Sequence, residues 1–85
     1  MYKLDFSAEG KASLALLDKE IGQRVLDKLK WLIQNIETIQ LLPLRGKYSG
    51  LFKLKVGDWR VIYEANHNEK VITVHRVGHR REIYR

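Results

Sequence analysis

Apolar and polar residues alternate most clearly from Leu51 to Tyr63, and this pattern predicts two short strands joined at Gly57-Asp58. A two-residue connection between alternating runs is a strong hairpin signal, because Gly and Asp tolerate the positive φ angles that such turns need. We expect the rest of the chain to be organised around this hairpin. With a loop of these two residues alone, one face of the hairpin carries three apolar pairs, which are Val56 with Trp59, Leu54 with Val61, and Phe52 with Tyr63.

The opposite face of the predicted hairpin is cationic. It carries Lys53 and Lys55, and Arg60 lies directly across the ribbon from Lys55. Like charges that face one another across paired strands lower the stability of a sheet. We therefore expect this face to bind an anion.

A short strand and two helices precede the hairpin. Apolar and polar residues alternate over residues 2–6, which is typical of a strand with one buried face. Ser7 is the expected cap of a first helix that ends near Leu17, with Ala8, Ala12, Ala15 and Leu16 facing inward. Asp18 is the expected cap of a second helix, whose apolar stripe is Ile21, Val25, Leu29, Leu32 and Ile36. Both helices are predicted to pack on a sheet as scaffold.

The segment after the second helix is a short basic connection. Pro43 ends the helical pattern, since the residue before a proline avoids the helical region. In the sequence LRGKYSG that follows, Arg45 and Lys47 flank a glycine. Two interpretations stay open: a plain connection, or a loop that holds a phosphate beside the hairpin lysines.

A third strand and a basic C-terminal segment complete the chain. Residues 71–77 are rich in β-branched side chains and complete a meander. Beyond them, Gly78 permits a bend, and Ile83 is expected to anchor the tail to the core. With a loop of residues 66–69, the predicted pairs are Ile72 with Tyr63, Val74 with Val61, and His75 with Arg60. That register places His75 on the cationic face, as either a structural or a catalytic residue.

Together these elements predict an α+β fold with an N-terminal strand, two helices and an antiparallel β-meander, the helices packing on one face of a small sheet. A chain of 85 residues supports one small core, so we expect a single domain over residues 1–85. The absence of cysteine excludes disulfides and thiolate metal sites. No apolar run approaches membrane-spanning length and no signal peptide is recognisable, so we expect a cytoplasmic protein without membrane association.

The net charge of +6 is confined to one half of the chain. Residues 1–44 hold six basic and six acidic side chains, whereas residues 45–85 hold ten basic and four acidic ones. The excess therefore lies in the half that contains the hairpin. A concentrated basic excess predicts a polyanionic partner, of which nucleic acid is the first candidate.

Several kinds of catalytic site are excluded. No pair of carboxylates is placed for glycoside hydrolysis, and the chain has neither a Gly-rich phosphate loop nor a Ser-His-Asp arrangement. A metal-dependent nuclease is disfavoured because the carboxylates of the basic half are scattered over turns and a strand edge; they are Asp58, Glu64, Glu69 and Glu82.

Lys, Arg, Tyr and His around a basic groove instead suit RNA cleavage without a metal or another cofactor. In that reaction the 2′-hydroxyl attacks the adjacent phosphate, and arginine and lysine stabilise the dianionic transition state. An isolated Lys or Tyr has a pKa of about 10, which neighbouring cations lower toward working pH. Lys53 and Lys55, which face Arg60, are therefore candidate bases. Phosphate binding without cleavage is the alternative.

The stretch LRGKYSGLFKLKVGDWRVIYEA, followed by VGHRREIYR, resembles the RelE branch of the RelE/ParE toxin superfamily. The resemblance spans the whole chain. It implies the toxin of a type II toxin–antitoxin system, an endoribonuclease that enters the ribosomal A site and cleaves messenger RNA during translation. It also implies a cognate RelB-like antitoxin that blocks the toxin in a hetero-oligomeric complex.

The resemblance also implies roles for individual residues. The catalytic set of the family falls on Lys53, Lys55, Arg60, Arg80 and Tyr84. Lysines and arginines of this set bind and activate the phosphate, and the tyrosine stacks on or orients the substrate. Further RNA-binding positions are Arg45, Lys47, His79 and Arg81. The proton donor stays open among His79, Arg80 and Tyr84.

Two other functions remain as alternatives. One is a ParE-like inhibitor of DNA gyrase, whose relatives share the fold but typically lack this full set of lysines, arginines and tyrosine. The other is a nucleic-acid-binding protein without catalytic turnover.

Overall fold

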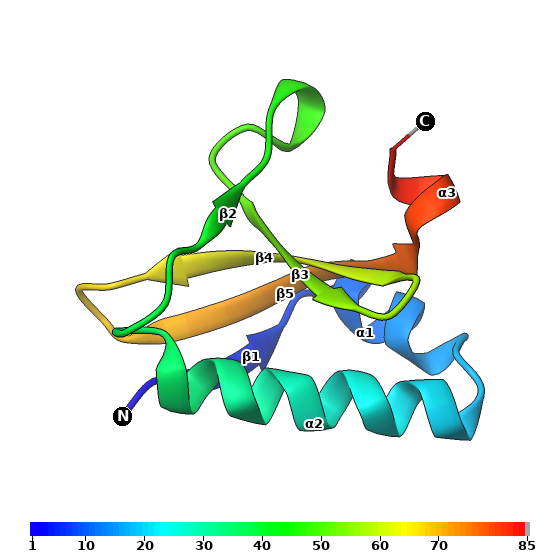
Figure 1. Ribbon diagram of the computed structural model, residues 1–85, viewed down its shortest axis with the longest axis horizontal. Coiled ribbons are helices and arrows are strands. Elements are labelled where there is room, and N and C mark those ends of the chain that lie inside the picture. Colours follow the sequence, from blue (N-terminus) through cyan, green and yellow to red (C-terminus); the bar gives the residue numbers. More distant parts are fainter. Residues whose placement is uncertain (85) are drawn as a thin grey trace.

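The computed structural model describes residues 1–84 and contains one five-stranded sheet. In chain order the elements are β1 (Lys3–Phe6), α1 (Ala8–Ala15), α2 (Lys19–Asn35), β2 (Leu42–Pro43), the 3₁₀ turn η1 (Gly46–Tyr48), β3 (Phe52–Val56), β4 (Trp59–Asn66), β5 (Val71–His79) and α3 (Arg80–Ile83). The strand order is β1-β5-β4-β3-β2, with β1 parallel to β5 and the other neighbours antiparallel. Helices α1 and α2 lie on one side of the sheet (Figure 1). The predicted α+β fold is confirmed.

The main core lies between α2 and the sheet. The Asp18 side chain caps α2 as predicted, with its Oδ1 accepting a hydrogen bond from the Ile21 N–H at 2.9 Å. The rest of the predicted stripe, Val25, Leu29, Leu32 and Ile36, is buried, whereas Ile21 in the first turn is half-buried. These side chains belong to one cluster with the apolar residues of the sheet, which are Leu54, Val56, Val61, Tyr63, Ile72, Val74 and Val77.

Helix α1 packs through a different face from the predicted one. The residues predicted to face inward, Ala8, Ala12, Ala15 and Leu16, are all exposed. The cap is as predicted, since Ser7 Oγ accepts a hydrogen bond from the Gly10 N–H at 3.0 Å. Gly10 faces β5 instead, so closely that an added Cβ would overlap the carbonyl oxygen of Val74. Ser13 Oγ accepts a hydrogen bond from the Val77 N–H at 2.9 Å. Small and polar residues therefore select the packing face, because they let the helix approach the strand backbone.

The hairpin of β3 and β4 has the predicted register. Gly57 in the turn has a φ of 59°, a conformation that glycine adopts without steric strain. Val56 pairs with Trp59, and Lys55 pairs with Arg60. Because side chains alternate along a strand, Lys53, Lys55 and Arg60 all lie on the face opposite α2.

The register of β5 differs from the predicted one. Strand β4 continues to Asn66, so the loop consists of residues 67–70. An irregularity between Ile62 and Tyr63 then shifts the pairing by one more residue. The observed pairs are Ile72 with Ala65, Val74 with Tyr63, Val77 with Val61, and Gly78 with Arg60.

The predicted contact between His75 and Arg60 is therefore wrong. His75 Nε2 lies 3.0 Å from Glu64 Oε1 instead. The other histidine of this region, His67, is exposed, and its Nδ1 lies 2.7 Å from the Tyr2 hydroxyl oxygen. Neither histidine joins the cations of the hairpin.

Two segments rise from the face of the sheet that the long helix leaves open (Figure 1). The connection after α2 forms β2, which pairs with β3, and then η1. The C-terminal segment forms α3, a single helical turn that the sequence pattern did not predict. Ile83 anchors this turn as predicted: it is buried and lies over Gly78, where an added Cβ would be 3.2 Å from Ile83 Cδ1.

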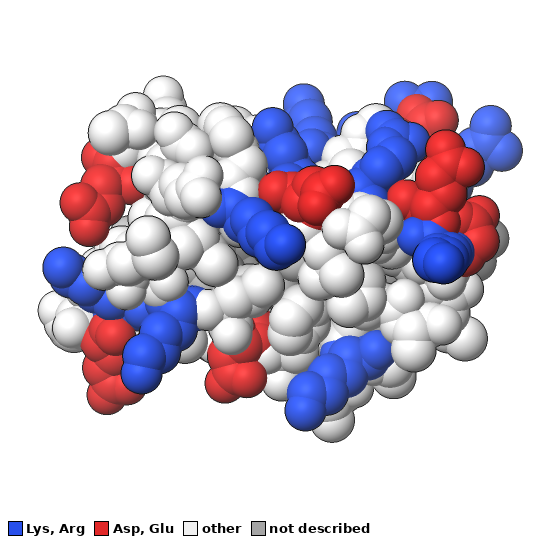
Figure 2. Space-filling model, turned by 90° about the horizontal axis from the view of Figure 1, so that it is seen from below, with Lys and Arg blue, Asp and Glu red and all other residues white. Residues whose placement is uncertain are grey.

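The side that carries α2 has a balanced surface charge. Figure 2 shows acidic and basic side chains interspersed across this side, in agreement with the equal numbers of basic and acidic residues in residues 1–44. This surface therefore lacks the continuous positive potential that favours nucleic acid.

The close approach of α1 to β5 makes a stability prediction with an internal control. Gly10→Ala should lower the free energy of unfolding by about 1–3 kcal/mol, because the new methyl group overlaps the Val74 carbonyl. Gly22→Ala in α2, where nothing lies within 4 Å of an added Cβ, should raise it by about 0.5–1 kcal/mol. Urea denaturation followed by circular dichroism measures both. Equal effects of the two substitutions would contradict the packing described for α1.

Candidate active site

A groove of about 440 Å³ lies between the connection after α2 and the C-terminal turn α3. It is lined by Pro43, Leu44, Arg45, Gly46, Lys47, Tyr48, Lys53, Ile83 and Tyr84. Four of these are predicted site residues, namely Arg45, Lys47, Lys53 and Tyr84. The groove opens on the face opposite α2, between the two segments that rise from the sheet in Figure 1.

Arg60 lies next to the groove, in contact with Tyr84, and is nearly buried, with 8% of its surface exposed. Its Nη1 donates to the carbonyl oxygens of Gly57 at 2.8 Å and of Trp59 at 2.9 Å. Its Nε donates to the hydroxyl oxygen of Tyr84 at 3.3 Å. The hairpin turn and the C-terminal segment thus fix the guanidinium from two sides.

Lys53 and Arg60 both lie close to Tyr84. The Lys53 Nζ is 5.0 Å from the centre of the Tyr84 ring, and the Arg60 Cζ is 5.9 Å from it. Partial burial raises the pKa of the Tyr84 phenol, but its hydrogen-bonding interactions with Lys53 and Arg60, and their positive charges, lower this pKa by more. The net direction is downward, so the phenolate forms more readily than in an isolated tyrosine.

Lys55 lies at the edge of the cationic cluster that Lys53 and Arg60 form. It is exposed and pairs with Arg60 across the hairpin, as the sequence predicts. Unlike Lys53, it is not part of the lining of the groove; it lines a crevice that runs along the outer edge of β3, between this strand and α2.

The predicted residues at the start of α3 separate in space. Arg80 is exposed, its Nε lies 3.8 Å from Asp58 Oδ1, and its backbone N–H donates to the Asp58 carbonyl at 2.9 Å. It therefore lies at the hairpin turn, next to the cluster. Arg81 is exposed.

His79 lies on the other side of the sheet. It pairs with Trp59, and their rings meet edge-on with centroids 5.4 Å apart. Its Nδ1 accepts a hydrogen bond from the Arg81 N–H and caps α3. Of the three candidate proton donors, Tyr84 contacts the cationic cluster directly, whereas His79 has a capping role.

Two residues that the sequence analysis did not select support the groove. Arg76 in β5 donates from Nη1 to the Tyr48 hydroxyl at 3.1 Å and so ties η1 to the sheet. The Lys47 Nζ lies 5.2 Å from the centre of the Tyr48 ring. The hydrogen bond between Arg76 and Tyr48 joins residues 28 positions apart, and no periodicity of the sequence indicates it.

Among residues 1–84, no group of three His, Asp or Glu side chains is placed to hold a metal ion. No helix in that range is long and apolar enough to cross a membrane. The ionisable residues that line the groove are Arg45, Lys47, Tyr48, Lys53 and Tyr84.

The match to a protein-family model identifies the class of this protein. The family model of the ParE toxin of type II toxin–antitoxin systems matches residues 4–84, and the chain belongs to this family. The family lies within the RelE/ParE superfamily, so the resemblance found in the sequence is confirmed. The comparison with curated proteins gave no significant match.

Solved structures of RelE toxins share the fold. The toxin–antitoxin complex RelBE2 from Mycobacterium tuberculosis is similar with a TM-score of 0.80 and 23% identity, over 92% of this chain and 96% of that chain. The isolated Escherichia coli RelE toxin has a TM-score of 0.76 and 23% identity, over 93% and 84%. The archaeal RelE–RelB complex from Pyrococcus horikoshii has a TM-score of 0.69 and 27% identity, over 93% and 94%.

The pKa values of two tyrosines should be shifted in opposite directions. Burial raises the pKa of Tyr63 to about 12, whereas that of Tyr84 is lowered. In an NMR titration of the tyrosine ring carbons, Tyr84 should therefore lose its proton first, and Lys53→Met should move its midpoint upward. Because the folded-state pKa of Tyr84 lies below the unfolded value, this group stabilises the fold at pH values above the unfolded pKa. That contribution is lost as pH falls through the folded pKa. A Tyr84 midpoint unaffected by Lys53→Met would contradict the described interaction.

Proposed function

We propose that this toxin is a ribosome-dependent endoribonuclease that cleaves messenger RNA in the ribosomal A site without a metal. The observation that carries the proposal is the contact of Arg60 and Lys53 with Tyr84 at the wall of a cationic groove. A phosphate in this groove meets the ammonium of Lys53 and the phenol of Tyr84, and the Arg60 guanidinium donates a hydrogen bond to that phenol. This set supplies both charge stabilisation and proton transfer.

The reaction that suits these groups is an internal transfer at phosphorus. The 2′-oxygen loses its proton and bonds to the adjacent phosphorus, and the bond from phosphorus to the 5′-oxygen of the next nucleotide breaks. The products are a 2′,3′-cyclic phosphate and a 5′-hydroxyl, so the leaving oxygen must gain a proton. Arg60 and Lys53 stabilise the dianionic transition state.

Two proton transfers need two groups on opposite sides of the phosphate. Tyr84 exchanges one proton, because its lowered pKa favours the phenolate more than in an isolated tyrosine. The other proton transfer is assigned to Lys55 or Arg80. Both lie at the turn end of the hairpin, where Lys55 pairs with Arg60 and Arg80 contacts Asp58. Arg45 and Lys47, on the far wall of the groove, bind the RNA backbone.

We further infer that a RelB-like antitoxin controls this activity in a cytoplasmic hetero-oligomeric complex. Solved relatives include the RelBE and DinJ–YafQ complexes, in which toxin and antitoxin are bound to one another. The basic excess of residues 45–85 favours an acidic partner.

Inhibition of DNA gyrase is the second candidate, and the ParE description of the matching family favours it. The two functions make different products in cells. After induction of the chain, the ribonuclease produces new 5′ ends in translated reading frames that repeat with the codon period. A gyrase inhibitor instead produces DNA breaks and an SOS response. Mapping transcript 5′ ends decides between them, and the absence of both products supports binding without turnover.

The catalytic assignment makes a quantitative prediction. Lys53→Ala should lower the single-turnover rate of messenger RNA cleavage on purified ribosomes by about 10²-fold or more, as expected for a group that stabilises transition-state charge. Lys3→Ala removes an exposed cation from β1, away from the groove, and should leave the rate within about twofold. Circular dichroism confirms that both variants fold. A fully active Lys53→Ala, Arg80→Ala double variant would refute the assignment.

A further inference from the structure

The edge of β3 has no neighbouring strand over part of its length. Strand β2 pairs with β3 only at Phe52 and Lys53. In the same register Lys55 would face Gln40, but β2 begins two residues later, at Leu42. Within the described residues, the outer edge of β3 is therefore open beside Lys55.

The backbone of Lys55 points toward this open edge. In a hairpin with a two-residue turn, the flanking residues Val56 and Trp59 form a hydrogen-bonded pair. Lys55 therefore belongs to the next, non-hydrogen-bonded pair, and its N–H and C=O face away from β4. The same alternation holds at the other end of the strand, where the Leu44 N–H donates to the Leu51 carbonyl at 2.9 Å. An added strand would find one donor and one acceptor ready at Lys55.

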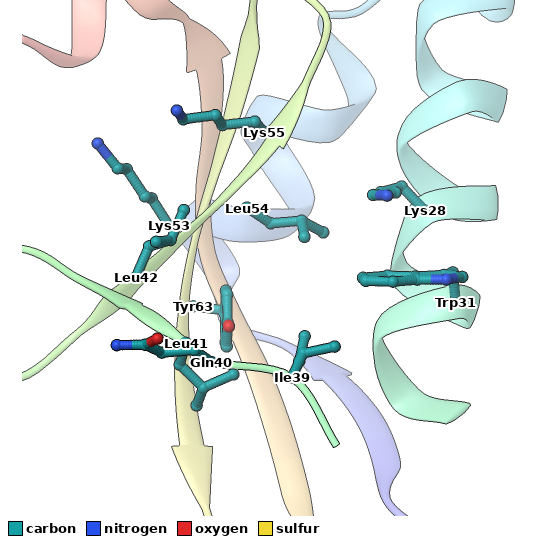
Figure 3. A pocket seen from close by; sticks show the side chains of 10 residues that line it. All are labelled: Lys28, Trp31, Ile39, Gln40, Leu41, Leu42, Lys53, Leu54, Lys55 and Tyr63. Atoms are coloured by element: carbon teal, nitrogen blue, oxygen red, sulfur yellow. The ribbon is translucent and has the colours of Figure 1, made fainter. Parts of the chain in front are cut away.

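A crevice follows this edge between β3 and α2 (Figure 3). It has two parts of about 240 and 440 Å³, and Lys28, Trp31 and Lys55 line both. Figure 3 shows Trp31 on α2 facing Leu54 across the gap. Trp31 and Leu42 are large apolar residues that remain 38% and 41% exposed. Both residues line the smaller part of the crevice, so an occupant of the crevice would meet exposed apolar surface there.

The rim of the crevice is cationic. Its charged lining residues are Arg24, Asp27, Lys28, Lys53 and Lys55. Four positive charges stand against one negative charge, so an acidic occupant is favoured. The Lys28 Nζ lies 3.9 Å from the centre of the Trp31 ring, which places a cation directly beside the apolar surface.

We propose that an extended segment of the antitoxin binds in this crevice and adds to β3 as a further strand of the sheet. This proposal rests on the proposed function for the identity of the partner. Side chains of an added strand point alternately to the two faces of the sheet. Apolar side chains of the segment on the α2 face pack on Trp31 and Leu54, and the intervening acidic ones, on the opposite face, meet Lys53 and Lys55.

This docking mode gives a direct route to inhibition. Lys53 lines both the crevice and the candidate active-site groove, and Lys55 lines both parts of the crevice. An acidic strand that pairs with the outer edge of β3 therefore neutralises two predicted catalytic lysines. It does so without entering the groove or displacing Tyr84.

Amide hydrogen exchange tests the strand addition directly. The ¹⁵N-labelled chain is compared by NMR alone and in the complex co-purified with its cognate antitoxin. The Lys55 amide should exchange rapidly in the free chain and at least about 10²-fold more slowly in the complex. The Leu54 amide, which faces β4, should be protected in both. A Lys55 amide that stays unprotected in an intact complex, or the absence of any complex, overturns the proposal.

Matched variants on α2 test the crevice. Lys28→Glu and Trp31→Ala should each weaken antitoxin binding by about tenfold or more, measured by calorimetry. Lys30→Glu makes the same charge change on the same helix at a residue that does not line the crevice, and should change the affinity by less than about twofold. Leu42→Ser serves as the second apolar variant if Trp31→Ala does not fold. Equal affinities for all variants overturn the proposal.

A cleavage assay separates this inference from the proposed function. Free Lys28→Glu should cleave messenger RNA at the normal rate but require more antitoxin for inhibition. If the Lys55 amide becomes protected while no variant cleaves RNA, the docking mode stands and the ribonuclease function fails. If RNA is cleaved while Lys28→Glu is inhibited normally, the docking mode fails and the ribonuclease function stands.

Discussion

A nearly buried guanidinium is the interaction on which the candidate site depends. Removing a charge from water costs several kcal/mol unless hydrogen bonds compensate it. For Arg60 the compensation comes from two carbonyl oxygens of its own hairpin and from the Tyr84 hydroxyl. The carbonyl of Gly57 reaches the guanidinium because the turn contains two residues and Gly57 accepts a positive φ. The position of the cation therefore depends on the shape of the turn and on the docking of the C-terminal segment.

One face of the sheet carries the main hydrophobic core, and the other carries the candidate active site. On one face, α2 and the apolar sides of the strands form the main core, and the outer surface of the helix is electrically balanced. On the other face, the C-terminal turn is held by the contact of Ile83 with Gly78 and by hydrogen bonds to Asp58 and Arg60. Lys53 and Lys55 lie on this second face, where substrate can reach them, whereas Arg60 beside them is nearly buried. A site of this kind needs a rigid support and a sparsely covered surface, and the alternation of side chains in a strand supplies both.

The hairpin register followed from the sequence because two local rules agreed. The Gly57-Asp58 turn fixed the loop length, and a slip of one residue would have exposed the whole apolar set. The face of α1 was not predictable from apolar spacing, since the close approach to Val74 depends on a missing side chain at Gly10. The register of β5 failed for a different reason: a bulge between Ile62 and Tyr63 is a tertiary feature without a local signal.

The candidate site was predicted in the same uneven way. Lys53, Lys55 and Arg60 lie together because they depend only on the hairpin. His79 lies apart from them, because strand β5 extends to that residue and its ring meets Trp59. The hydrogen bond from Arg76 to Tyr48 was not predicted, because it joins a loop to β5, whose predicted register was wrong.

The position of β5 between β1 and β4 has a consequence for how the chain folds. Both β1 and α1 dock on β5, through pairs such as Lys3 with Val71 and through Gly10 on Val74. These contacts join residues more than 60 positions apart, and the entropy of closing such a loop must be overcome before they contribute stability. The N-terminal strand and the first helix therefore cannot dock on the sheet until β5 has been synthesised. The hairpin, in contrast, can form locally. Until then the nascent chain exposes apolar surface, and this interval is when it is most open to proteases and to aggregation.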